Sequence, residues 1–472
     1  MLVLPAILNP FVEDAPAAVM TRLALDWIID GTPLDELFEE VAGDQYTREF
    51  TLRHFVEVMV DVASGFRPNP RAAFLRRNLA LIASISAFYR KLNRMGLPVP
   101  MAVVRRTALR ARQLIVASGG LKPEPVPGYS ARILDGNVMT GTEHRIVPLR
   151  TTWSAGLPGM SLAVYEPASE LILDLILEEN AHCQERALVD RIVIEPGQLW
   201  IMDRNFCLRS LLFRIARREA FFLVRWHRST LPFTAVSRLR PRGRCATGRI
   251  YEQEIDVADN EGGIHRLRRI VLKLDQPTRD GETEIVLVTN LPADVAPIQC
   301  CDAYSDRWQI EGHYQTLTDL LHCEVPTLGY PRAALFAFSM SAVAGNALAV
   351  LKANLRVAHG PEMAEEVSDY ALVGEVAEVY PGMMKAVPPA RWPNLSRCRA
   401  TTVARLLTEL ADRLPLHRML RCRRGPKKPR PRRSSGKRIH HVSNKKLLDQ
   451  ARAARAPRHT SRSPRAAPTY AK

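Results

Sequence analysis

The stretch QLWIMDRNFCLRSLLFRIARREAFFLVRWH, residues 198–227, decides the fold class, because it joins two short apolar runs through one amphipathic segment. The runs at 199–202 and 221–225 have the length and composition of buried strands. Between them, residues 208–220 place apolar side chains at helical spacing. A strand, a helix and a second strand in succession predict an α/β sheet whose faces are covered by helices.

Other β-rich runs lie on both sides of this unit. ARILDGNVM (131–139) and MSLAVYEP (160–167) come before it, and ENAHCQERALVDRIV (179–193) is predicted to be helical. After it, residues 229–292 contain YEQEIDV, IHRLRRIVLKL and EIVLVTNL, separated by the turn sequences DNEGG and TRDGE. No helical pattern interrupts these runs, so we expect an antiparallel β subdomain inserted into the α/β unit.

The whole chain is therefore divided as follows. We expect an N-terminal helical domain, a first part of the α/β core, the β-rich insertion, a second part of the core, a C-terminal helical region and a basic tail, at 1–127, 128–228, 229–292, 293–352, 353–424 and 425–472. The tail is rich in Pro, Arg and Ser and is too poor in apolar residues to order itself, so it is predicted to be disordered.

Positive charge is concentrated in this tail. Lys and Arg outnumber Asp and Glu by 66 to 49 in the whole chain, but 19 of the basic residues and only one acid lie between Arg418 and Lys472. The first 417 residues carry 47 basic and 48 acidic residues, which is close to neutral. The tail would attract a DNA backbone. A solvated extension with no specific role remains the alternative.

Several classes of protein are disfavoured by composition. The eight cysteines include no CxxC pair and no Cys/His set at zinc-ligand spacing, which argues against a disulfide scaffold or a structural zinc site. The N-terminus has no basic segment before its apolar stretch, so no secretory signal is predicted and we expect a cytoplasmic protein. Residues 333–351 contain no charge over nearly a membrane span, but Ser339, Ser341, Gly345 and Asn346 favour a buried helix.

One further helix is notable for its arginines. VVRRTALRARQLIVASGG (103–120) places Arg105, Arg106, Arg110 and Arg112 on an amphipathic helix predicted to end at Gly119-Gly120. Such a helix is usually a solvated face, and a DNA contact is the alternative.

Two aspartates follow apolar runs. Asp135 comes after Ile133-Leu134, and Asp203 comes after Leu199–Met202, so each is expected where a buried strand leaves the core. Ligands in open α/β sheets gather at strand ends. Taken singly, Asp135-Gly136 is also a good turn dipeptide, and Asp203 could cap the next segment.

A third carboxylate has an informative neighbourhood. In AYSDRWQIEGHYQTLTDLLH (303–322), Tyr304, Arg307 and Glu311 are spaced three and four apart and are expected on one face of one helix. An aromatic ring, a guanidinium and a carboxylate on one stripe suit a phosphate site beside a metal. A surface ion-pair stripe would look similar.

YSDRWQIEGHY, preceded by LVTNLP, resembles the signature of insertion-sequence-four type transposases: Tyr, two residues, Arg, three residues, Glu, six residues, Lys. In that family the glutamate completes a DDE triad, and the aspartates lie upstream in contexts like LDGN and MDRN. Asp135, Asp203 and Glu311 match by context, order and wide spacing. The resemblance covers roughly residues 45–440 and is most specific around Glu311. The chain departs at position 318, where Thr318 replaces the signature lysine, and at Asn137, where the family more often has a hydroxyl residue.

The resemblance implies an RNase H-like core, a mixed sheet flanked by helices and split by the β insertion between the second aspartate and the glutamate. It implies two Mg²⁺ or Mn²⁺ ions held by the triad, with Asp135 bridging both, and DNA cleavage followed by strand transfer. The implied partners are transposon terminal inverted repeats, bound by the N-terminal region, and target DNA, with a homodimer assembled on DNA near the bacterial nucleoid. No membrane partner is expected.

Further residues are expected to contact DNA. Tyr304 and Arg307 would position phosphate, and Thr318 could donate one hydrogen bond to it. Trp308 could stack on a displaced base, although a buried core tryptophan is the alternative. Arg204, next to Asp203, is a weaker candidate. The competing functions are a catalytically inactive, domesticated DNA-binding protein and a basic RNA-associated structural protein.

Overall fold

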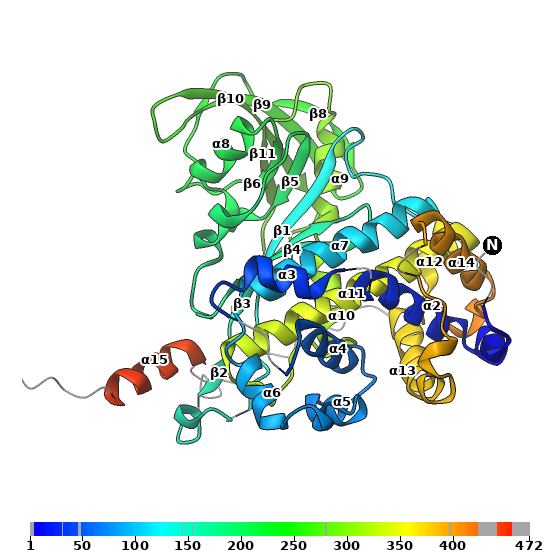
Figure 1. The fold of residues 1–472 in the computed structure, drawn as a ribbon. Helices are drawn as coiled ribbons and strands as arrows, with labels where there is room; N and C mark the ends of the chain where they lie inside the picture. The colour runs from blue at the N-terminus through cyan, green and yellow to red at the C-terminus, as the bar shows by residue number, and fades with distance from the viewer. Residues whose placement is uncertain are drawn as a thin grey trace, which may run out of the picture.

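The computed structural model describes residues 4–30, 32–45, 49–143, 145–152, 154–278, 281–395, 398–422 and 441–455. Within these residues, a ten-stranded mixed sheet lies against a large body of helices (Figure 1). The prediction of an α/β protein with a mixed sheet flanked by helices is therefore confirmed.

The sheet has three parallel strands in its middle and antiparallel strands on both sides. β1 is antiparallel to β3 and parallel to β5, β3 is antiparallel to β4, and β5 is parallel to β6. The order across the sheet is β4-β3-β1-β5-β6-β11-β10-β9-β7, and β8 pairs with β9. Their bounds are β1 (Ser130–Val138), β3 (Met160–Glu166), β4 (Leu171–Glu178), β5 (Gln198–Met202), β6 (Phe221–Arg225), β7 (Thr234–Ala235), β8 (Arg240–Cys245), β9 (Gly248–Ala258), β10 (Ile264–Leu274) and β11 (Glu284–Thr289).

Residues 229–292 form antiparallel strands, as their alternating pattern indicates. β11 pairs with β6, with Val288 opposite Val224, and β10, β9, β8 and β7 follow outward. The insertion therefore extends the main sheet instead of forming a sheet of its own. An unpaired edge of β6 would expose a row of backbone donors and acceptors, and β11 covers it.

Helices cover both faces of the sheet. One face packs on α8 (Arg209–Arg217), which connects β5 and β6, and the other packs on the helical body. That body contains α1 (Asn9–Asp14), α2 (Pro16–Leu25), α3 (Leu34–Val41), α4 (Leu52–Ala63), α5 (Pro70–Arg76), α6 (Ile85–Leu92), α7 (Pro98–Ser118), α9 (Pro297–Asp306), α10 (Gln309–Asp319), α11 (Pro331–His359), α12 (Pro361–Glu366), α13 (Asp369–Ala386) and α14 (Ala400–Ala411).

The end of α7 shows how the sequence sets the packing. The helix stops at Ser118 because Gly119 adopts a left-handed conformation with φ 78°, as the Gly-Gly pair predicts. A Cβ on Gly120 would stand 2.5 Å from the carbonyl oxygen of Ala353 in α11. Glycine therefore lets the chain leaving α7 pass close to the backbone of α11.

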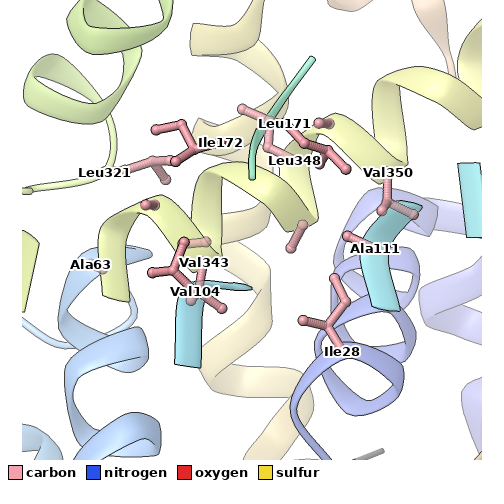
Figure 2. Packing of buried hydrophobic residues seen from close by; sticks show 14 of the residues in the cluster. Ile28, Ala63, Val104, Ala111, Leu171, Ile172, Leu321, Val343, Leu348 and Val350 are labelled. Atoms are coloured by element: carbon pink, nitrogen blue, oxygen red, sulfur yellow. The ribbon is translucent and has the colours of Figure 1, made fainter. Parts of the chain in front are cut away.

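The apolar segment predicted at 333–351 is the central helix α11. Figure 2 shows Val343, Leu348 and Val350 of α11 packed among Val104 and Ala111 of α7 and side chains of other elements. Within the described residues this is the one helix long and apolar enough to cross a membrane, and 94% of its apolar window is buried inside the protein. The buried-helix interpretation is confirmed.

A polar residue in α11 secures the edge of the sheet. The Asn346 side chain donates to the carbonyl of Ile172 and accepts from its N–H, both at 2.9 Å. Ile172 lies in β4, the outermost strand on that side. Asn346 therefore satisfies edge backbone groups that would otherwise be buried without partners.

Two sequence predictions are wrong about local structure. Residues 179–193 form two short 3-10 turns, Glu185–Ala187 and Val189–Arg191, instead of a helix. The tail is not wholly disordered either, because His441–Ser443 form β12, which pairs with β2 (Ala155–Leu157), and Asn444–Arg455 form α15. The remaining tail positions, 425–440 and 456–472, lie outside the described residues.

A buried side chain, Asn444, helps to fix the docked part of the tail. Asn444 is fully buried and donates a hydrogen bond of 2.8 Å to the carbonyl of Gly329. Composition averages over the whole tail, so it misses a short segment whose backbone pairs with another part of the chain.

Candidate active site

The two aspartates lie on neighbouring parallel strands at one level of the sheet. Leu134 pairs with Met202, and Asp135 and Asp203 are the next residue on each side of this pairing, so they lie at the same level of the sheet. Asp135 is where the buried run in β1 ends, although β1 itself continues to Val138. The alternative of an Asp-Gly turn is therefore wrong.

Asp203 combines both roles considered for it. It follows the last residue of β5, as predicted, and its side chain accepts a hydrogen bond of 2.8 Å from the backbone N–H of Asn205. It thereby caps the short 3-10 helix Arg204–Phe206. The cap fixes the direction of the carboxyl group at the strand end.

Glu311 reaches the same region from a different element. The single helix expected through residues 304–311 is two helices, because α9 ends at Asp306 and α10 begins at Gln309. Arg307 lies in the turn between them. Its guanidinium contacts the Glu311 carboxylate at 3.2 Å and the Asp135 carboxylate at 3.8 Å. Arg307 therefore links two of the predicted triad residues directly.

The turn divides its two aromatic neighbours between core and solvent. Tyr304 is buried, with its ring 5.9 Å from the Arg307 guanidinium carbon, whereas Trp308 is 61% exposed and its ring is 5.2 Å from the same carbon. The core alternative for Trp308 is wrong. Burial lowers the pKa of Arg307, but Tyr304, Asp135 and Glu311 outweigh this and raise it above its usual value.

Asp135 experiences the strongest perturbation in the cluster. Burial raises the pKa of its carboxyl group to about 7, Arg307 opposes the rise, and Asp203 and Glu185 add to it. Like charges close together disfavour ionisation. Near neutral pH this aspartate is divided between its protonated and ionised forms.

Glu185 is a fourth carboxylate that sequence reasoning missed. Burial and then Asp203 raise the pKa of Glu185, so it belongs to the same cluster. A methyl group added to Gly136 would overlap the Glu185 carboxyl group, so glycine next to Asp135 makes room for it. The residue lies in one of the 3-10 turns of the segment predicted to be helical, and no spacing rule connects it to the triad.

Two of the predicted DNA contacts have partners within the chain. The Thr318 hydroxyl donates a hydrogen bond of 3.0 Å to the carbonyl of Tyr314, one turn earlier in α10. Arg204 makes an ion pair of 2.6 Å with Glu282, which also pairs with Arg225. Arg204 thereby anchors the β10–β11 connection beside Asp203.

The arginines of α7 also bind within the protein. Arg105 pairs with Asp174 at 2.6 Å, Arg106 with Glu40 at 3.3 Å and Arg112 with Glu166 at 2.9 Å. The Arg110 guanidinium carbon lies 4.1 Å from the centre of the Trp27 ring. These arginines therefore connect the helix to the sheet and to the N-terminal helices.

The donor chemistry of the cluster suits a hard cation, because Asp135, Asp203, Glu185 and Glu311 offer carboxylate oxygens only. As the side chains stand, the described residues contain no group of three or more His, Cys, Asp or Glu arranged to hold a metal ion. The Arg307 guanidinium lies between Asp135 and Glu311 and contacts both.

Comparison of the whole chain with protein-family models and with curated proteins gives no match in either case.

Proposed function

We propose that this protein is a DNA transposase that cleaves phosphodiester bonds at transposon ends and transfers the strands into target DNA. The observation that carries the proposal is the meeting of three carboxylates, far apart in sequence, around one buried arginine. Asp135 and Glu311 both contact Arg307, and Asp203 lies close enough to raise the pKa of Asp135. The family resemblance assigns the same three acids, Glu311 by the signature and the two aspartates by their context and order.

The fold is compatible with the RNase H-like core that we propose. Asp135 lies in β1, Asp203 directly follows the adjacent parallel strand β5, and β7–β11 come between Asp203 and Glu311 in the chain. This is the order that the resemblance implies, with a β insertion after the second aspartate. The inserted strands extend the sheet without separating the three acids.

In this proposal Asp135, Asp203 and Glu311 hold two Mg²⁺ or Mn²⁺ ions, and Glu185 is available as a further oxygen donor. When bound, the ions would stabilise charge on the attacking and leaving oxygens of the phosphodiester. Arg307 holds a permanent positive charge beside the acids and would release Glu311 to contact phosphate. Ionised Asp135 is the form that binds a cation, so activity should rise as the pH passes through about 7.

The remaining parts of the proposal concern partners. Terminal inverted repeats would bind the region 1–127, target DNA would approach the exposed Trp308, and two copies would assemble on the DNA, in the cytoplasm at the nucleoid. The basic tail would add attraction that does not depend on sequence.

The decisive experiment uses the full chain, Mg²⁺ and duplex DNA carrying the terminal repeats of the element that encodes it. We expect nicks at the repeat ends that disappear in Asp203→Ala and persist in Asp412→Ala, which removes an exposed acid from the helical body. Nicking by Asp203→Ala at the wild-type rate would overturn the proposal.

One observation favours the alternative, an inactive DNA-binding protein derived from a transposase. The signature lysine is absent, and the Thr318 hydroxyl is occupied by the carbonyl of Tyr314. Under this alternative, wild-type protein binds the repeats without nicking them. Thr318→Lys should tighten binding to the repeat ends, and no gain would mean that another cation already fills the role.

A further inference from the structure

Three cations stand in one row across the strands β8, β9 and β10. Arg249 of β9 is directly opposite Arg244 of β8 on one side and directly opposite Lys273 of β10 on the other. Directly opposite residues point to the same face of a sheet. All three side chains are exposed, so this cationic row lies open to solvent.

The row is unfavourable for the isolated protein. Like charges directly opposite each other destabilise a strand pair, and Arg249 has such a neighbour on both sides. Acids reduce this repulsion only at the two ends of the row: Asp275 pairs with Arg244 at 2.6 Å, and Glu284 of β11 is opposite Lys273. Among the described residues, no carboxylate lies within ion-pairing distance of Arg249. A bound anion would supply the missing negative charge.

The row lies at the end of the sheet that carries the acid cluster. Met202, the residue before Asp203, pairs with Val224 at the end of β6. The connection from β10 to β11 reaches this end, because Glu282 within it forms ion pairs with Arg204 and Arg225. Lys273 is near the end of β10, close to where this connection begins.

The face of the row differs from the face held by α9. Ile250, next to Arg249 along β9, points into the core that includes Cys300 and Cys301 of α9, so Arg249 points to the opposite face. Farther along β9, Ile255 packs in the second core with α8. The row occupies the part of this face that α8 leaves open.

We propose that Arg244, Arg249 and Lys273 bind the phosphodiester backbone of duplex DNA that extends from the carboxylate cluster. This assignment rests on the proposed function for the identity of the polyanion. Neighbouring strands lie about 4.8 Å apart, so the row spans on the order of 10 Å across an exposed part of the sheet face. An open line of cations suits an extended backbone better than a small enclosed anion. The ring of Tyr251, 5.0 Å from the Lys273 ammonium group, supports the end of the row.

The test measures duplex binding without divalent metal, by fluorescence anisotropy over a series of salt concentrations. The row variant carries Arg244→Gln, Arg249→Gln and Lys273→Gln. Each lost phosphate contact lowers the slope of log affinity against log salt by about 0.9, so the slope should fall by about 2 to 3. The same relation predicts binding on the order of 100-fold weaker near 0.15 M salt.

A matched variant, Arg217→Gln with Arg405→Gln and Arg413→Gln, removes the same net charge from exposed sites elsewhere. This variant should lower the affinity for duplex DNA and the salt slope only slightly, through the change in net charge alone. The row variant should also melt close to wild type, because the relief of repulsion around Arg249 offsets the loss of the exposed Arg244–Asp275 ion pair. Equal affinity and equal salt slope in the two variants would overturn the assignment.

The outcomes separate this inference from the proposed function. If the row variant loses duplex binding while wild type never nicks DNA with Mg²⁺, the surface stands and the transposase proposal fails. If wild type nicks DNA and the row variant binds it normally, the surface assignment fails alone.

Discussion

Asp135→Asn should make the protein more stable, by an amount that grows from pH 5 to pH 8. Burial raises the pKa of Asp135 to about 7 from an ordinary value of 3.8, so between these values the folded state binds a proton that the unfolded state does not. Stability therefore falls as pH rises from about 4 to 7 and is then constant. Each pH unit between the two pKa values lowers the free energy of unfolding by about 1.4 kcal/mol, so the total loss is about 4 kcal/mol.

The amide has the shape of the protonated carboxyl group and is neutral at every pH, so the variant avoids this loss. An unfolding entropy of about 2 cal/mol/K per residue gives about 1 kcal/mol/K for a chain of 472 residues, and hence a rise in Tm of about 4 °C at pH 8. Thermal melting at pH 5, 6, 7 and 8 measures the difference in Tm between the variant and wild type. Asp412→Asn, at an exposed site, is the control.

The reasoning would be refuted if the variant melted below wild type at pH 8. It would also be refuted if the difference in Tm between the two proteins were the same at every pH, because the cost of ionising Asp135 would then be absent. Metal supplies a second readout. A cation that binds the ionised acids stabilises wild type by mass action, so Mg²⁺ should raise its Tm at pH 8 and narrow the gap to Asp135→Asn. An equal response of both proteins would argue against metal binding through this carboxylate.

Two further substitutions test the packing around the site and the sheet. Gly136→Ala should lower stability by about 1–3 kcal/mol, since the added methyl group overlaps Glu185 and the neighbour must move; unchanged denaturant unfolding would contradict this. Asn346→Leu should cost about 2–5 kcal/mol, because it leaves the N–H and carbonyl of Ile172 buried without partners. Ser341→Ala should change the unfolding midpoint little, since that hydroxyl bonds only within its own helix at 3.2 Å, and equal losses in the two variants would count against the edge-strand role of Asn346.

The sequence was informative wherever a residue acts through its immediate neighbours. Apolar runs located β1 and β5, the Gly-Gly pair ended α7, and the absence of charge in 333–351 identified the central helix. Asp203 could be placed because a strand end is visible in one short run. These features depend on periodicity and backbone geometry, which a few adjacent residues determine.

Other features depend on contacts that the chain brings together only when folded. The Glu185 carboxyl group joins the cluster because Gly136, far away in sequence, leaves room for it. Residues 441–455 are ordered because β12 finds a partner in β2. The acidic partners of Arg105, Arg106 and Arg112 lie on distant elements, so the sequence of α7 alone could not identify them.

The break between α9 and α10 connects both kinds of information to the chemistry. The spacing of Arg307 and Glu311 was readable, and they do contact each other at 3.2 Å. The turn at Arg307 and Trp308 was not readable, yet it lets the guanidinium reach Asp135 on a strand while the indole faces solvent. A continuous helix would keep Arg307 in the regular direction of its own face. The broken helix instead places the buried Arg307 guanidinium between two acids from different elements. Its positive charge stabilises both carboxylates until a metal ion binds one of them or a phosphate binds the guanidinium.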